Sequence, residues 1–217
     1  MSLALNVADF PIASGAELMG YHNVRGTLAI AANLGGTLRA PQGRFSVNAR
    51  QISLSATKNP QLANLGLAVD SNWNGRSLDL KGQVIGLKDD QIGFSGAVPL
   101  LLNPAPLGIS VPTDGRLALQ LQGSGQLEHL ADLLPLGEDR VSGHFATNIA
   151  VGGTVGAPAA NGRLQLSDAR YENFATGAVL TKMQADLVGD RDRFNLTSFS
   201  ADDSASGSLK EIGRAHV

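Results

Sequence analysis

Apolar and polar residues alternate along most of the chain. Leucine occupies positions 117, 119 and 121 in the stretch 115–122 (GRLALQLQ), and residues 144–151 and 179–187 follow the same pattern, the latter from Val179 to Leu187. A period of two places the apolar side chains on one face of a β-strand and the polar ones on the other. Clusters rich in Gly, Asn and Asp, such as NWNGR at 72–76, separate these stretches and predict turns. We therefore expect a chain built mainly of β-strands, each with one wet face.

A helical pattern stands near the middle of the chain. Residues 126–134 (QLEHLADLL) carry apolar side chains at spacings of three and four. Ser124 is expected to cap the N-terminus of this helix, and Pro135 is expected to stop it. The sequence thus predicts one short helix, acting as a plug or as a cover for the edge of a sheet.

The apolar positions of the predicted strands carry little bulk. Ala, Val, Leu and Gly dominate them, and aromatic residues make up only 5% of the 217 residues. A closed sandwich normally buries more aromatic side chains than this. We therefore expect an open, curved sheet whose concave face is apolar and accessible to a ligand.

The sequence repeats itself at an offset of about 117 residues. Residues 26–41 (GTLAIAANLGGTLRAP) match residues 143–158 (GHFATNIAVGGTVGAP), and the similarity extends far enough to define repeat units near 26–50 and 143–170. We expect the Gly-Gly pair to allow a bend or bulge. The Ala-Pro pair is expected to end its strand, because proline cannot donate a hydrogen bond to the ladder, and the following Gly-Arg pair to open the next one. Repeats of this kind predict an array in which each unit mainly contacts its neighbours.

Composition and motifs argue against several classes of function. The formal net charge is −2, so no basic face for nucleic acid is expected. The chain has no Cys, which excludes disulfides and thiolate metal sites. It contains no phosphate-binding loop, no dinucleotide fingerprint and no nucleophile elbow. We therefore predict no catalytic residue, no metal site and no cofactor, and expect that the chain is not an enzyme.

Two kinds of titratable residue are expected to lie at the surface. The histidines lack ligand spacing to one another, so solvated or capping roles are expected for them; they are His22, His129, His144 and His216. Asp89 and Asp90 lie in a turn-like segment without the spacing of a calcium loop, so we expect exposed carboxylates there.

The order of several short motifs carries a family resemblance. They are GHFATNIAVGGTVGAP (143–158), NGRLQLSDARYENFATGAVLTKMQADL (161–187) and DRFNLTSFSADDSASGSL (192–209), preceded by residues 111–143 with the short helix. Each motif is degenerate, and the specificity lies in their order along the chain. In this order the sequence resembles the C-terminal conserved region of the TamB (translocation and assembly module) family, within the AsmA-like superfamily.

The resemblance implies a β-taco fold, which is an elongated, twisted half-pipe of mainly antiparallel strands with an apolar concave face. It implies a periplasmic protein, anchored to the inner membrane by an N-terminal helix that is absent here. The implied partners are phospholipid acyl chains and, through a missing part of the protein, an Omp85-type (TamA-like) outer-membrane barrel. The implied function is outer-membrane biogenesis, by phospholipid transport between membranes along a hydrophobic groove, by scaffolding the assembly and secretion of outer-membrane proteins, or by both.

The alternation also selects the side chains expected to line such a groove. Each methylene group kept from water is worth about 0.8 kcal/mol, so an apolar groove lowers the cost of moving lipid through an aqueous space. An alternative is that the same side chains pack against the opposite wall of the half-pipe. The candidates are Leu117, Leu119, Leu121, Phe145, Ile149, Val151, Leu164, Leu166, Met183 and Leu187.

A second class of function stays open beside the lipid groove. A surface adhesin or passenger-like β-solenoid would also be rich in strands and turns, and it predicts short, regular coils of about 20 residues. The long repeat offset and the predicted helix argue against that architecture.

The last seven residues, 211–217 (EIGRAHV), do not continue the alternation. Translated back into DNA, they match the start of a common sequencing-library adapter, which continues with a stop codon. We therefore expect residues 1–210 to be a fragment of a repetitive β-taco domain and residues 211–217 to be adapter read-through.

Overall fold

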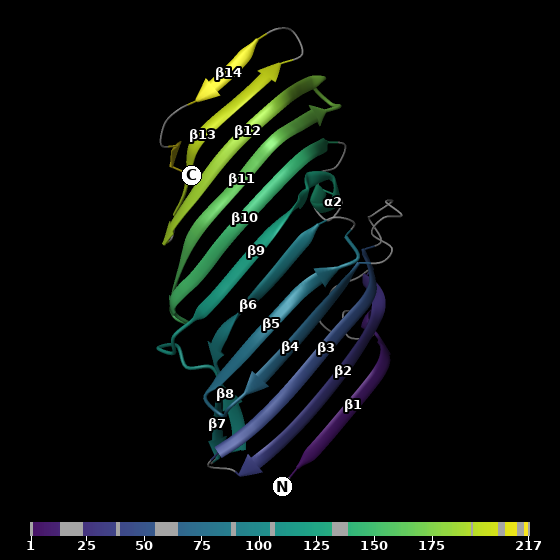
Figure 1. Ribbon diagram of the computed structural model, residues 1–217, viewed down its shortest axis with the longest axis vertical. Helices are drawn as coiled ribbons and strands as arrows, with labels where there is room; N and C mark the ends of the chain where they lie inside the picture. The colour runs from purple at the N-terminus through teal and green to yellow at the C-terminus, as the bar shows by residue number, and fades with distance from the viewer. Residues whose placement is uncertain are drawn as a thin grey trace. The chain divides into compact units, whose positions relative to one another are not determined.

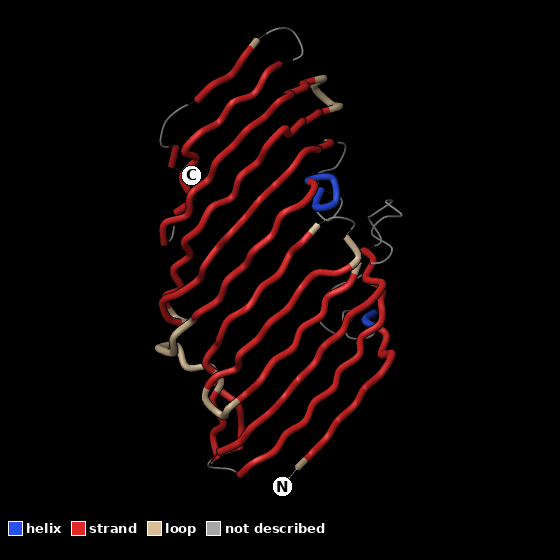
Figure 2. The backbone as a smooth tube through the Cα atoms, viewed as in Figure 1, coloured by secondary structure: helices blue, strands red, loops and turns tan. Residues whose placement is uncertain are grey.

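β-Strands dominate the computed structural model (Figure 2). Helical structure in its described part is limited to α2 (Leu127–Ala131) and to Ile12–Ala13 after the first strand. No helix of that part is long and apolar enough to cross a membrane. The described residues are 2–13, 24–37, 40–54, 65–87, 90–104, 107–131, 139–191, 193–203, 207–211 and 215–216. The predicted all-β class with a short helix is confirmed; residues 132–134 of that predicted helix lie outside the described residues.

The strands follow one another in chain order (Figure 1). Every strand pair with a described register is antiparallel, as the family resemblance implies. The strands are β1 (Leu3–Pro11), β2 (Val24–Thr37), β3 (Ala40–Leu54), β4 (Gly66–Trp73), β5 (Ser77–Ile85), β6 (Gln91–Pro99), β7 (Leu101–Pro104), β8 (Leu107–Ser110), β9 (Ala118–Gln126), β10 (Arg140–Thr154), β11 (Ala157–Asn173), β12 (Ala178–Arg191), β13 (Arg193–Asp203), β14 (Ser208–Glu211) and β15 (Ala215–His216).

The chain divides into two compact units. Unit 1 consists of Met1–Lys88, Gly93–Gln120 and Val151–Pro158, and unit 2 consists of Asp89–Ile92, Leu121–Ala150 and Ala159–Val217. The hydrogen-bonded order is β1-β2-β3-β4-β5-β6-β9 in unit 1, where β7 and β8 form a separate pair. In unit 2 it is β9-β10-β11-β12-β13-β14, with β15 paired to β13. Neither order closes on itself, so the sheet is open.

The buried core of the described residues is small and light. No large side chain among them is less than 2% exposed. Trp73 is buried at the end of β4, where its Nε1 donates a hydrogen bond of 2.7 Å to the Leu100 carbonyl. The buried apolar residues are Ala49, Leu65, Trp73, Phe145, Ala169, Ala185 and Ala201. With so few bulky buried groups, most apolar side chains of the sheet stay half-buried.

The sequence repeat corresponds to two hairpins with the same backbone. The hairpin β2–β3 and the hairpin β10–β11 both turn after a Gly-Gly-Thr segment. The second glycine of each has a positive φ, 85° at Gly36 and 81° at Gly153. This conformation is open to glycine at little cost, which explains why Gly-Gly recurs at the turn.

The threonine of each copy closes the turn in the same way. Thr37 Oγ1 accepts a hydrogen bond of 3.1 Å from the Ala40 amide, and Thr154 Oγ1 accepts one of 3.2 Å from the Ala157 amide. The prediction that Ala-Pro ends a strand is wrong, because this pair begins the returning strand in both copies and Gly-Arg lies inside that strand. Proline is tolerated there because the first residues of a strand do not require every ladder hydrogen bond.

Both returning strands also carry a bulge at an equivalent position. Gln51 in β3 has φ 52°, and Asp168 in β11, 117 residues later, has φ 48°. The register of β3 with β2 shifts at Gln51, and the register of β11 with β12 shifts at Asp168. The repeat therefore extends from the turn to the bulge.

A further bulge corrects one predicted face. Lys182 in β12 has φ 49°, and the β11–β12 register places Leu180, rather than Val179, opposite Tyr171. The predicted alternation from Val179 to Leu187 is therefore wrong in its first part, because the extra residue at the bulge exchanges the two faces.

Candidate functional site

The ten groove candidates are distributed over both units. Those of unit 1 are Leu117, Leu119 and Val151, and the other seven lie in unit 2. Phe145 is 5% exposed, and the remaining nine are half-buried. Most residues that alternate with them, including Gln120 and Asn148, are exposed. The two predicted faces are thus present on these strands.

The register of unit 2 brings several candidates side by side. Leu164 on β11 lies opposite Leu187 on β12, and Leu166 lies opposite Ala185. Met183 lies opposite Ala169, beyond the bulge. The apolar positions of neighbouring strands therefore form a continuous surface of small and aliphatic side chains.

A hollow of about 710 Å³ lies in unit 2, and residues of both faces of the sheet line it. Its lining includes Gln165, Asp186 and Ser198, which occupy one row across β11, β12 and β13. Phe145 and Leu166 of the apolar row line it as well, together with Ala185, which lies opposite Leu166. Asp90 and Gly125 also border this hollow, so it does not belong to the polar face alone.

The polar face also carries an ion pair. Arg163 Nε lies 2.8 Å from Asp186 Oδ1, and Arg163 Nη2 lies 2.6 Å from Asp186 Oδ2. The Arg163 side chain is 56% exposed, so this pair contributes at most about 1 kcal/mol to stability.

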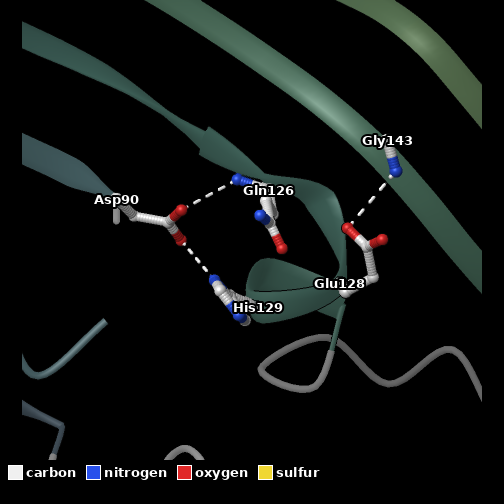
Figure 3. A network of polar contacts seen from close by, with 5 residues as sticks. All are labelled: Asp90, Gln126, Glu128, His129 and Gly143. Atoms are coloured by element: carbon white, nitrogen blue, oxygen red, sulfur yellow. Dashed lines mark hydrogen bonds and ion pairs between the residues drawn. The ribbon is translucent and has the colours of Figure 1, made fainter. Parts of the chain in front are cut away.

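A second polar network lies beside α2, where the sequence predicted exposed groups (Figure 3). The carboxylate of Asp90 is fully buried, and its Oδ2 lies 2.7 Å from Nδ1 of His129, which is itself buried. Its Oδ1 accepts a hydrogen bond of 2.9 Å from the Gln126 amide. The predictions of a solvent-exposed Asp90 and of a solvated or capping His129 are therefore wrong.

Glycine at position 125 makes room for this carboxylate. A Cβ at Gly125 would collide with the side chain of Asp90, whereas a Cβ at Gly123 would meet its nearest neighbours at 3.4 Å. The predicted cap, Ser124, lies inside β9 and is exposed. The Gln126 amide before α2 is instead bound by the side chain of Asp90, the residue that precedes β6.

The helix is also tied to the strand on its other side. The Gly143 amide of β10 donates a hydrogen bond of 3.3 Å to Glu128 Oε2 (Figure 3). α2 is therefore connected both to Asp90 and to β10.

Sequence patterns contain one signal that points to the buried carboxylate. Asp90 shares its parity with Ile92 and Phe94, which are apolar positions of β6. An acidic residue at the end of an apolar row is expensive to bury without a partner, so it calls for one. The partner, His129, lies 39 residues away along the chain, and nothing local identifies it.

The site contains no arrangement that points to a metal among the residues the structure describes. No group of three or more His, Cys, Asp or Glu side chains in that part of the chain is placed to hold an ion. Comparison of the chain with protein-family models, with curated proteins and with solved structures finds no match.

Proposed function

We propose that this chain is a segment of a TamB-like protein whose apolar sheet face shields phospholipid acyl chains from water. One observation carries the proposal. The apolar positions of the strands form a continuous row across β11 and β12, yet nine of the ten candidates remain partly exposed. A sheet face of this kind offers aliphatic contact surface that the described core leaves uncovered.

The chemistry of the face suits acyl chains better than polar ligands. Its side chains are Leu, Ile, Val, Met and Phe, which provide dispersion contacts and no hydrogen-bonding groups. Each methylene placed there and removed from water gains about 0.8 kcal/mol. The polar headgroup would stay in water, beyond the apolar row. The role of the protein is then physical, and no covalent chemistry is required.

The wider setting is part of the same proposal. In the whole TamB-like protein this segment would act in the periplasm. That protein would carry an inner-membrane anchor elsewhere and would have an Omp85-type barrel as its partner at the outer membrane. Lipid transport and assembly of outer-membrane proteins are both compatible with an apolar sheet face, because each requires a surface that protects apolar groups in water.

The adhesin or β-solenoid alternative receives less support from the fold. In a β-solenoid of this kind, the strands of successive short coils pair in parallel. Here successive strands such as β2, β3 and β4 pair antiparallel, and β10 and β11 are 15 and 17 residues long. The lipid-binding proposal is therefore preferred.

Site-specific photo-crosslinking tests the proposal. A benzoylphenylalanine placed at Leu119 or Ile149 should form adducts with phospholipid, and mass spectrometry of the adducts should identify acyl chains. The matched controls are Gln120 and Asn148, which are the exposed neighbours on the other face of the same strands. Absence of lipid at Leu119 and Ile149, or equal amounts of lipid at all four positions, would contradict it.

A further inference from the structure

We infer that α2 is a lid over the apolar face of unit 2, held closed by the buried carboxylate of Asp90. Phe145 and the apolar surface beside it then form an acyl-chain site that becomes accessible when the lid leaves. The identity of the ligand rests on the proposed function, whereas the lid itself rests on the contacts of α2 alone.

The position of Asp90 places the helix on the apolar side of the sheet. Along β9 the residues Leu121, Gly123 and Gly125 share one face by alternation. A Cβ on Gly125 would point into the Asp90 carboxylate, so that carboxylate lies on the same face as Leu121. His129 binds Asp90 there, and α2 therefore approaches the sheet from its apolar side.

The bonds of Asp90 act as a latch because one ends on α2 and the other on the residue directly before it. Asp90 Oδ2 lies 2.7 Å from His129 Nδ1 in the helix, and Asp90 Oδ1 accepts a hydrogen bond from the amide of Gln126, the last residue of β9. Asp90 itself precedes β6, so these bonds fasten the helix to a neighbouring strand (Figure 3). The carboxylate is fully buried, and removal of its partners would leave a charge without compensation.

Burial of the candidate residues is greatest beside the helix. Glu128 of α2 binds the amide of Gly143, and Phe145 follows two residues later on β10. Phe145 is the one buried candidate, at 5% exposure, whereas Ile149 farther along the strand is half-buried. A lid at this end of the face accounts for that difference.

The helix is too short to persist without these ties. α2 has five residues, and isolated helices shorter than about 12 residues are marginal in water. Its apolar residues Leu127 and Leu130 are partly exposed, so neither anchors the helix as a fully buried side chain would. Loss of the latch should therefore release the helix while the strands remain paired.

Thiol labelling measures release of the lid directly. The chain contains no Cys, so Leu130→Cys introduces a single reporter on α2. In this background Asp90→Asn should accelerate maleimide labelling about tenfold, because hydrogen bonds to the carboxylate are lost. Asp186→Asn is the matched control, since it makes the same chemical change in the exposed pair of the same unit and should leave the rate unchanged.

Two results of the labelling would overturn the lid. One is an unchanged rate in a folded Asp90→Asn protein, with folding checked by circular dichroism. The other is an equal acceleration in Asp186→Asn. If Asp90→Asn does not fold, His129→Gln decides the question, because it weakens the latch while keeping the bond from Asp90 to the Gln126 amide. An unchanged rate in that variant also overturns the inference.

Lipid crosslinking separates the lid from the proposed function. Benzoylphenylalanine at Phe145 should give several-fold more lipid adducts in Asp90→Asn than in the parent, with Ile149 as the reference position outside the lid. Adducts at Ile149 together with no change at Phe145 would reject a lid over an acyl site. Faster labelling of α2 without lipid at either position would reject the lipid function and leave the movable helix standing.

Discussion

The two copies of the repeat have the same backbone and different surroundings. The turn glycines, the threonine contacts and the bulges recur at the same offset in β2–β3 and in β10–β11. Beside the second copy, α2 is bound to a buried carboxylate and to Gly143. Beside the first copy lies β1, whose Leu3 and Leu5 are 62% and 55% exposed.

This difference shows that backbone shape and face coverage have separate causes. The shape follows from a few residues with special conformations, which the repeat preserves. The coverage depends on which other described segments lie against the apolar face. In the second copy this is a latched helix, and at β1 large apolar side chains remain in contact with water.

The largest expected effect comes from removing the feature that distinguishes the second copy. Asp90→Ala should lower the free energy of unfolding of unit 2 by about 3–5 kcal/mol, because it breaks the buried pair between Asp90 and His129. Asp186→Ala, in the half-exposed pair with Arg163, should cost at most about 1 kcal/mol. Urea denaturation followed by circular dichroism compares the two variants. Similar midpoints would show that the buried pair of Asp90 contributes no more to stability than the Asp186 pair.

The next effect tests the glycine that makes room for the latch. Gly125→Ala should destabilise the protein by about 1–3 kcal/mol, since its Cβ collides with Asp90. Gly123→Ala is the control on the same strand and face, where the nearest atoms are 3.4 Å away. Thermal unfolding should separate the two variants, and a Gly125→Ala protein as stable as Gly123→Ala would show that Asp90 does not occupy this place.

The features shared by the two copies should respond alike. Gly36→Ala and Gly153→Ala each force a positive φ on a residue with a Cβ, so each should cost about 1–2 kcal/mol. Gly35→Ala should cost less, because no atom lies within 4 Å of its Cβ and its φ is not positive. Hydrogen exchange of the turn amides reports the local effect, and a response in one copy alone would break the equivalence of the hairpins.

The smallest effect compares apolar side chains at different degrees of burial. Leu121→Ala should cost roughly 0.5–1 kcal/mol more than Leu5→Ala, because Leu121 is half-buried while Leu5 is mostly in water. Guanidinium denaturation of both variants gives the comparison. Equal costs would indicate that coverage of the face contributes nothing to stability.

Alternation in the sequence was enough to predict the strands and their two faces. It succeeded for Leu119 and Ile149 because each strand keeps its period of two through those positions. It failed at Val179, where the bulge at Lys182 exchanges the faces, and nothing in the local sequence marks that bulge. The repeat was visible in the sequence. Its Ala-Pro pair was expected to end one strand, but it lies after the turn and begins the next strand.

The polar network was beyond local patterns for a different reason. Asp and His are residue types that usually lie at the surface of a protein. Asp90 and His129 meet only because β6 and β9 are neighbours in the sheet. Gly125 is required only once Asp90 is in place. Such pairs are set by tertiary contacts, so the sequence predicted the helix but not what holds it.

The central claim, that the apolar face binds acyl chains, can be tested along a single strand. NMR spectra of the chain with a phospholipid that carries a doxyl spin label on its acyl chain would report which side chains of β10 approach the lipid. If acyl chains bind this face, Thr147 and Ile149 should show paramagnetic broadening, with much weaker broadening at Ala146 and Asn148 on the other face. Equal broadening at all four residues, or none at any of them, would contradict it.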